Sequence, residues 1–293
     1  MNLVLTVLEI VAPVFLLAAV GFFWVKLGIE YRTRFVTQLA MSLAVPSLVF
    51  TALQDTKISP SSLQALSLAT IVSYGAVTHV AITLLRRSGL RMRTYLAPVT
   101  FGNTGNLGLP LALFAFGQEG LGYAVVVFAI MAIYSFTFGV WVVAGGGSPL
   151  KALKEPMVAA TILGALFLWQ GWHTPPFLTN TLELIGQMAI PLMLITLGVA
   201  LARLSPNSIA LPAVVSALKI AFCVAIAWVA GRWFQLDPVA FGVLVIQVST
   251  PVAVTSYLLA EKYGADSETV AGLVVLSTLF SVVTLPLTLA FVI

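Results

Sequence analysis

The chain reads FGNTGNLGLPL at residues 101–111, and this stretch carries Gly102, Gly105, Gly108 and Pro110 inside an otherwise apolar run. Relative to alanine, a glycine costs an α-helix about 1 kcal/mol and a proline about 3 kcal/mol. In lipid, an interrupted helix leaves backbone N–H and C=O groups unpaired, which is tolerated only where protein or a water-filled cavity receives them. The stretch therefore predicts a membrane helix that is broken near the middle of the bilayer, beside a cavity.

The composition of the whole chain indicates a lipid environment. Of its 293 residues, 60% are hydrophobic and 8% are charged, against roughly 25% charged residues in soluble domains. The formal net charge of +4 does not indicate nucleic-acid binding, because no cluster of Lys and Arg is interleaved with stacking aromatic residues. We therefore predict an integral, all-helical membrane protein that has no nucleic-acid partner.

Apolar runs of about 20 residues, the length that spans a bilayer, recur along the chain. The connections between them are too short to hold a soluble domain, so any function must reside in the membrane part. The runs cover residues 4–25, 34–54, 63–85, 95–116, 121–143, 153–170, 178–202, 209–233, 238–260 and 268–292. The sequence thus predicts ten transmembrane helices.

The distribution of basic residues predicts how these helices are oriented. The connections after the first, third, fifth, seventh and ninth runs hold 11 of the 14 Lys and Arg, whereas the connections after the even-numbered runs hold 2. Lys and Arg concentrate in cytoplasmic connections. We therefore expect both termini to lie outside the cytoplasm.

Landmarks recur at nearly half the chain length, which indicates an internal repeat. Pro110 and Pro251 are 141 residues apart, and a second pair of prolines is 145 residues apart. Each half would hold five helices, and because five is an odd number, the halves would insert with opposite orientations, as in many transporters. We predict an N-terminal repeat of residues 1–145 and an inverted C-terminal repeat of residues 146–293, whose fourth and ninth helices are broken and cross at the midplane.

The second predicted break lies in the ninth run, at QVSTPVAVTS, around Ser249, Thr250 and Pro251. Proline favours the first turn of a helix, so Pro110 and Pro251 are expected to begin the second half-helices. Two helix N-termini that meet from opposite sides would bind an anion such as a carboxylate. The alternative is a pair of proline kinks that are packed closely by glycine.

Several polar side chains within the runs are candidate ligands. Asn103, Thr104 and Asn106 belong to the first break and are expected, with the polar pair of the second, to line a substrate site. Lys219, deep in the eighth run, could neutralise a bound anion, pair with a backbone carbonyl or remain uncharged as a structural element. His79 is expected to be a packed helix residue. Catalytic and metal-binding motifs are absent from the sequence, so we predict neither enzymatic activity nor a metal or cofactor.

Two segments resemble the signature regions of the auxin efflux carrier family, whose bacterial members include malonate carriers. They read FGNTGNLGLPLALFAFGQEGL in the first half and STPVAVTSYLLAEKYGADSETVAGLVVLSTLFSVVTLPLTL in the second. The resemblance implies a fold similar to bile acid/sodium symporters and sodium/proton antiporters, with an elevator-like movement of a crossover domain against a scaffold domain. It also implies that Asn103 binds a substrate carboxylate. Val252 replaces a polar residue that the plant carriers often have, which puts an indole-acid substrate in doubt.

The residues and the resemblance together predict a secondary transporter of a small organic anion, either a mono- or dicarboxylate such as malonate or an auxin-like acid. We expect it in the bacterial cytoplasmic (inner) membrane, with the lipid bilayer and the substrate as partners, and the resemblance makes a homodimer reasonable. The coupling ion, Na⁺ or H⁺, stays open. The alternatives are a sodium-coupled symporter of the bile acid type and a membrane sensor that binds a ligand without moving it.

Overall fold

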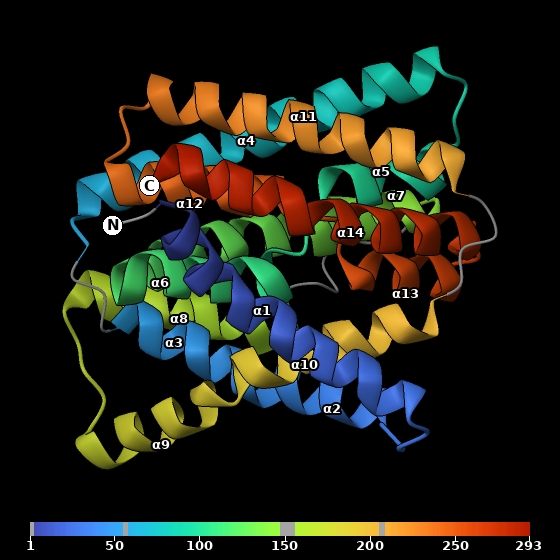
Figure 1. Cartoon of the computed structure of the whole chain (residues 1–293). Helices are drawn as coiled ribbons and strands as arrows, with labels where there is room; N and C mark the ends of the chain where they lie inside the picture. Colours follow the sequence, from blue (N-terminus) through green and yellow to red (C-terminus); the bar gives the residue numbers. More distant parts are fainter. Residues whose placement is uncertain (1–2, 55–57, 147–155, 205–208) are drawn as a thin grey trace.

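The computed structural model of the chain is helical, and among the residues that it describes no β-strand occurs (Figure 1). The described residues are 3–54, 58–146, 156–204 and 209–293, so three of the basic residues used to predict the orientation, Lys57, Lys151 and Lys154, lie outside them. The helical elements are α1 (Leu3–Lys26), α2 (Thr33–Leu39), the π-helix η1 (Ala40–Ala44), α3 (Val45–Gln54), α4 (Pro60–Arg87), α5 (Met92–Thr100), the π-helix η2 (Thr104–Gly108), α6 (Leu109–Tyr134), the π-helix η3 (Ser135–Gly139), α7 (Val140–Ala144), α8 (Pro156–Gln170), α9 (Pro176–Gln187), α10 (Ala189–Arg203), α11 (Ala210–Trp233), α12 (Pro238–Ser249), α13 (Val254–Lys262) and α14 (Ser267–Val292).

Seven of the described helical stretches are long and apolar enough to cross a membrane. They are Val7–Lys26, Thr33–Gln54, Pro60–Arg87, Thr104–Ala144, Pro176–Arg203, Ala210–Trp233 and Ser267–Val292. The stretch Thr104–Ala144 joins parts of the expected fourth and fifth spans across a kink at Gly117, where φ is 63°. Two further apolar helices, Ala159–Gln170 and Pro238–Ser249, are shorter than a full span. The structure therefore establishes a polytopic helical membrane protein, and the ten-helix inverted repeat is not confirmed.

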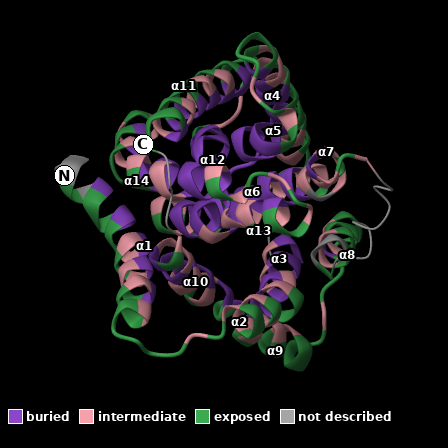
Figure 2. Ribbon diagram, turned by 90° about the vertical axis from the view of Figure 1, so that its right-hand side faces the viewer, coloured by how far each residue is buried: buried purple, intermediate pink, exposed green. Residues whose placement is uncertain are grey.

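The helices form two groups with a buried layer between them. In the first group α1 packs along α10, and α3 packs against α8 and α9; in the second, α11 packs against α4, α12 and α14. Figure 1 shows α11 and α4 on one side of the molecule and α9 on the opposite side. Figure 2 shows that buried residues concentrate in α12, α5 and α6, which lie between these outer helices. The two interrupted helices described below therefore lie in the interior of the protein.

Small residues let α1 and α10 approach until their backbones touch. A Cβ atom added to Gly198 would collide with the backbone carbonyl of Ala18, and one added to Gly21 would collide with the carbonyl of Ile195. Membrane helices use small residues for such close packing, because lipid supplies no hydrophobic force that would press the helices together. The pair α1 and α10 therefore packs as one unit with little room for larger side chains.

Two prolines inside membrane helices are preceded by a π-turn. Pro46 and Pro110 each occupy the second position of an α-helix that follows a five-residue π-helix, η1 in one case and η2 in the other. A proline in an α-helix lacks an N–H group and clashes with the carbonyl four residues before it. In a π-turn the backbone hydrogen bonds run from residue i to residue i+5. The carbonyl four residues before the proline therefore does not need the missing N–H group of the proline. The π-turns thus let these helices continue through a proline.

The prediction that Pro110 and Pro251 begin the second half-helices is wrong. Helical backbone resumes at Thr104, six residues before Pro110, because η2 accommodates the proline within a continuing helix. After the second break the helix resumes only at Val254. The residue that precedes a proline is driven out of the helical conformation, and Thr250 accordingly has ψ 148°, so Pro251 lies in the extended segment between α12 and α13.

The close contact between α1 and α10 predicts a difference between two chemically identical substitutions. Gly198→Ala should destabilise the protein by about 1–3 kcal/mol, because the new methyl group meets a backbone carbonyl that cannot move without separating the helices. Gly75→Ala in α4 is the matched control, since a Cβ atom at that position meets nothing within 4 Å. Thermal unfolding of the two purified variants in detergent measures the difference. Equal midpoints for both variants would contradict the close α1–α10 contact.

Candidate functional site

The first interruption separates α5 from η2. The helix α5 ends at Thr100, and Phe101 adopts an extended conformation with φ −101° and ψ 121°. Asn103 precedes the next helical segment with φ −82° and ψ 53°, and η2 begins at Thr104. The predicted break among the glycines and asparagines of this run is therefore present, although it comprises only residues 101–103.

The second interruption separates α12 from α13. The helix α12 ends at Ser249, and the chain stays non-helical through Ala253, which has φ −68° and ψ 137°. The helix α13 then begins at Val254. This break is also present where the sequence predicts it, and its extended segment comprises residues 250–253.

The two interruptions lie side by side and run in opposite directions. Gly102 and Val252 form an isolated antiparallel bridge, and the backbone N–H of Asn103 donates to the carbonyl of Pro251 at 2.7 Å. A Cβ atom at Gly102 would collide with Oγ1 of Thr250. Glycine is therefore required here so that the two extended segments can pair.

Side chains from two further helices satisfy the remaining polar groups of the second segment. The ammonium group of Lys219 on α11 donates to the carbonyl oxygen of Thr250 at 2.7 Å. The backbone N–H of Val252 donates to Oγ of Ser277 on α14 at 2.9 Å. Both helices thus contribute to holding the buried residues 250–253 in place, because buried peptide groups need hydrogen-bond partners.

A small cavity of about 60 Å³ lies against the paired interruptions. Its lining residues are Met41, Phe101, Gly102, Asn103, Gly105, Asn106, Phe128, Met131, Ala132, Ser135, Ala253, Val254 and Thr255. Gly105 and Asn106 belong to the first turn of η2, and Val254 and Thr255 belong to the first turn of α13. The N-terminal ends of both second half-helices therefore border this cavity, and such ends carry a partial positive charge and free N–H groups.

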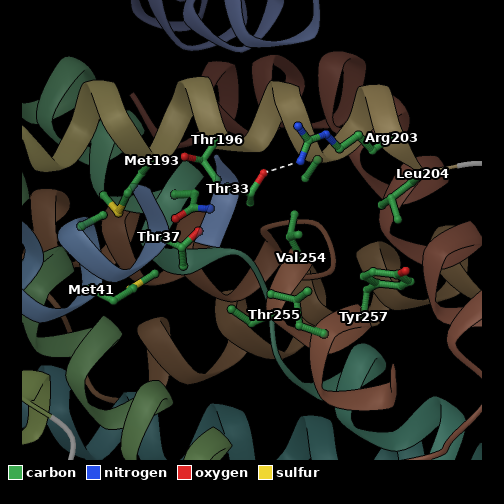
Figure 3. A pocket seen from close by; sticks show the side chains of 14 residues that line it. Thr33, Thr37, Met41, Met193, Thr196, Arg203, Leu204, Val254, Thr255 and Tyr257 are labelled. Atoms are coloured by element: carbon green, nitrogen blue, oxygen red, sulfur yellow. Dashed lines mark hydrogen bonds between the residues drawn. The ribbon is translucent and has the colours of Figure 1, made fainter. Parts of the chain in front are cut away.

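A larger cavity of about 290 Å³ shares residues with the small one (Figure 3). The shared lining residues are Met41, Asn106, Val254 and Thr255. The other lining residues of the larger cavity are Thr33, Thr37, Ala40, Met193, Thr196, Ala200, Arg203, Leu204, Tyr257 and Leu258. The two cavities together reach from the interruptions to the end of α10.

Arg203 gives the lining of these cavities a positive charge. Among the described residues that line them, it is the one charged side chain. Its guanidinium group donates to Oγ1 of Thr33 at 2.6 Å and to the carbonyl of Tyr31 at 2.8 Å, and Figure 3 shows the bond to Thr33. Because no carboxylate is present in this lining, the cavities present a positive or neutral surface to a ligand.

Two polar side chains at the first interruption are buried without a partner. Among the described residues, Nδ2 of Asn103 and Oγ1 of Thr104 are buried and make no hydrogen bond. Leaving such a group unsatisfied costs about 1–3 kcal/mol. Asn103 also lines the small cavity. Asn103 therefore holds an unpaired Nδ2 donor beside this cavity.

The predicted site residues separate into two sets. Asn103 and Asn106 line the small cavity, whereas Ser249, Thr250 and Lys219 line neither of the two cavities. The hydroxyl of Ser249 donates to the carbonyl of Ile246 at 3.1 Å, and that of Thr250 donates to the carbonyl of Gln247 at 2.7 Å. These hydroxyls therefore cap the end of α12. Thr104 is buried next to Asn103 and lines neither cavity.

Sequence reasoning missed several residues that line the cavities. Met41, Ser135 and Thr255 reach the small cavity from three different elements, and Arg203 reaches the larger one from the end of α10. Thr255 was the easiest to find, because it lies four residues after Pro251, at the start of the half-helix. Arg203 entered the sequence analysis only as one of the basic residues that predict orientation.

A third cavity lies at the opposite end of the same helices. It has a volume of about 650 Å³, and its lining includes Thr51 near the end of α3, Gln118 in α6 and Glu183 in α9. The helical stretch Thr33–Gln54 thus borders the larger cavity near its beginning and this third cavity near its end. The stretch Pro176–Arg203 borders the third cavity in its first half and the larger cavity near its end. The two cavities therefore face opposite ends of these helices.

Relatives of the chain are transporters by name. An uncharacterized transporter of Methanothermobacter thermautotrophicus is 28% identical over 292 residues, which cover 95% of this chain and 96% of the relative. An uncharacterized transporter of Methanocaldococcus jannaschii is 24% identical over 304 residues, covering 96% and 97%. A protein of Rhizobium meliloti, named as a candidate malonate transporter, is 24% identical over 266 residues and covers 83% of this chain and 81% of the relative.

The match to a protein family spans nearly the whole chain. The family described as Membrane transport protein matches residues 6–152 and 140–289. Both interruptions and all the cavity-lining residues named above lie inside these matched ranges. The chain therefore belongs to the Membrane transport protein family, which is the auxin efflux carrier family that its sequence resembles, and it is a membrane transporter.

Proposed function

We propose that the chain is a secondary transporter of a small organic anion, a mono- or dicarboxylate such as malonate, that binds at the crossing of the two interrupted helices. The observation that carries this proposal is the position of Asn103. The buried Nδ2 of its side chain has no hydrogen-bond partner among the described residues, and Asn103 lines a cavity that two helix N-termini border. An amide N–H and helix N-termini are donors that a carboxylate accepts from.

The charge of the cavities supports an anionic substrate. Their described lining holds Arg203 and no Asp or Glu, so a bound carboxylate would meet no like charge. The hydroxyl groups of Thr37 and Thr255 add donors along the path from the interruptions to Arg203. A cationic substrate would find no carboxylate among these lining residues and would face two positively polarised helix ends.

The size of the two cavities at the crossing favours a small substrate over a bile acid. Sites for drug-sized ligands have volumes of about 300–1,000 Å³, and the larger cavity, at about 290 Å³, lies at the lower limit. A dicarboxylate could place one carboxylate near Asn103 and extend the other toward Arg203. The name of the Rhizobium meliloti relative, a candidate malonate transporter, supports the same class of substrate.

The cavities at opposite ends of the same helices support transport by alternating access. In this proposal the ten runs form two inverted repeats, residues 1–145 and 146–293, and the helices that contain the interruptions belong to a crossover domain that moves against a scaffold domain. Both termini lie outside the cytoplasm, the membrane is the bacterial inner membrane, and the carrier is a homodimer. The larger cavity then opens to the cytoplasm and the third cavity to the outside.

The proposed site predicts that Asn103→Ala impairs transport. Losing a hydrogen bond to a charged ligand costs about 1.5–3 kcal/mol, so malonate uptake into proteoliposomes should fall by about 10- to 100-fold while membrane insertion is retained. Asn180→Ala is the matched control, because Asn180 on α9 is exposed and lines none of the three cavities. Malonate uptake by Asn103→Ala at the level of the control would exclude this binding site, and a wild type that binds malonate without moving it would be a sensor.

The proposed orientation predicts the side from which each cavity can be labelled. Cys223 is the single cysteine and is buried, so Cys223→Ala provides a background for single cysteines at Thr37 and Glu183. A membrane-impermeant maleimide should label Glu183→Cys in intact cells, and should label Thr37→Cys only when the cytoplasmic side is exposed in inverted vesicles. The reverse pattern would show that the termini lie in the cytoplasm.

A further inference from the structure

Lys219 is a buried lysine whose hydrogen-bond partner lies at the end of a helix. Its side chain is 0% exposed, and its ammonium group donates to the carbonyl oxygen of Thr250 at 2.7 Å. Among the described residues, the one ion pair joins Arg32 and Glu30. No carboxylate therefore pairs with the Lys219 ammonium in the part of the chain that the structure describes.

The cost of burying this charge indicates what compensates for it. A buried ammonium group without compensation costs several kcal/mol. The last carbonyl groups of an α-helix lack partners within the helix and carry about half a negative charge. The carbonyl of Thr250 follows directly after the last residue of α12, Ser249. The Lys219 ammonium therefore lies where the negative end of α12 attracts a cation.

The oxygen atoms at this end of α12 resemble the ligands of an alkali cation. In transporters with discontinuous helices, unwound backbone carbonyls and the C-terminal ends of half-helices coordinate Na⁺. Here the carbonyl of Thr250 is bound by the ammonium, and the hydroxyls of Ser249 and Thr250 already donate to carbonyls of α12. The hydroxyl of Thr100, at the end of α5, is buried without a partner among the described residues. The side-chain nitrogen of Lys219 thus occupies the position from which a cation would contact the Thr250 carbonyl oxygen.

We propose that the Lys219 ammonium takes the place of a coupling Na⁺ at the crossing, so that this carrier neither needs nor binds Na⁺ there. Lys219 is a positioning residue, because it acts on the substrate site through the segment of residues 250–253 that pairs with residues 101–103. The inference rests on the proposed function, since it specifies the ion requirement of the same crossing. It assigns Lys219 to the end of α12 and leaves the substrate to Asn103 and Arg203.

Thermal unfolding in NaCl and in choline chloride at equal ionic strength tests this proposal without any substrate. The unfolding temperature of the wild type should be the same in NaCl and in choline chloride. The unfolding temperature of Lys219→Arg should likewise not differ between the two salts. Lys219→Met should unfold at least about 4 °C lower than the wild type in choline chloride, because a carbonyl group of the crossing loses its partner. NaCl should then restore at least half of that loss, because Na⁺ can enter the position that the ammonium leaves.

A purely structural role for Lys219 would lower the unfolding temperature without creating a sodium effect. A destabilised Lys219→Met that NaCl does not restore therefore overturns the proposal, as does a variant that is as stable as the wild type. If Lys219→Met does not fold, the wild type and Lys219→Arg still test the proposal. An unfolding temperature that is higher in NaCl than in choline chloride for either protein overturns it. Lys262→Met is the control, because Lys262 is an exposed lysine at the end of α13 and should show neither effect.

Adding malonate to the same samples separates this proposal from the proposed function. Malonate should raise the unfolding temperature of the wild type equally in NaCl and in choline chloride. A rise that requires Na⁺ overturns the role of Lys219 and leaves the substrate assignment intact. The absence of any rise with malonate or other small carboxylates rejects the proposed substrate class, while the sodium comparison without substrate still judges Lys219.

Discussion

The structure depends on satisfying the peptide groups of two helices that stop inside the protein, where these groups are buried. The pairing of residues 101–103 with residues 250–253 satisfies part of this requirement, through the bond from the N–H of Asn103 to the carbonyl of Pro251. Lys219 and Ser277 satisfy a neighbouring carbonyl and N–H group of the second segment. An unpaired peptide group in this environment costs several kcal/mol, so the crossing, its two supporting helices and the small residue at Gly102 form one interdependent unit.

The position of both breaks could be predicted from the sequence, because glycine and proline act on the backbone within a few residues. The points at which the helices resume could not, since η2 lets the first helix continue through Pro110, and a five-residue π-turn leaves no clear compositional signal. Likewise, the sequence could not predict whether Lys219 contacts a bound anion or a backbone carbonyl, because its partner depends on where α11 packs against α12. Arg203 and Met41 reach the cavities from elements far away in the sequence, and a single sequence carries no information on such contacts.

The number of transmembrane helices stays a prediction for a related reason. Hydropathy locates apolar runs, but the broken helix α12 is shorter than a full span, and the helix that continues past Gly117 joins two expected spans into one stretch of 41 residues. Length and composition therefore undercount the helices at the places where the chain departs from regular geometry. These departures lie next to the cavities, so the features that obscure the topology are the ones that build the candidate site.

The orientation of the four half-helices explains how an apolar protein could present a positive site with a single charged residue in its lining. The N-terminal ends of η2 and α13 border the small cavity, whereas α5 and α12 reach the crossing with their C-terminal ends, whose partial negative charge would repel an anion. In our proposal, the ammonium of Lys219 offsets this charge at the end of α12. A cation at this position would add to the positive potential of the crossing, although Lys219 lines neither of the two cavities there.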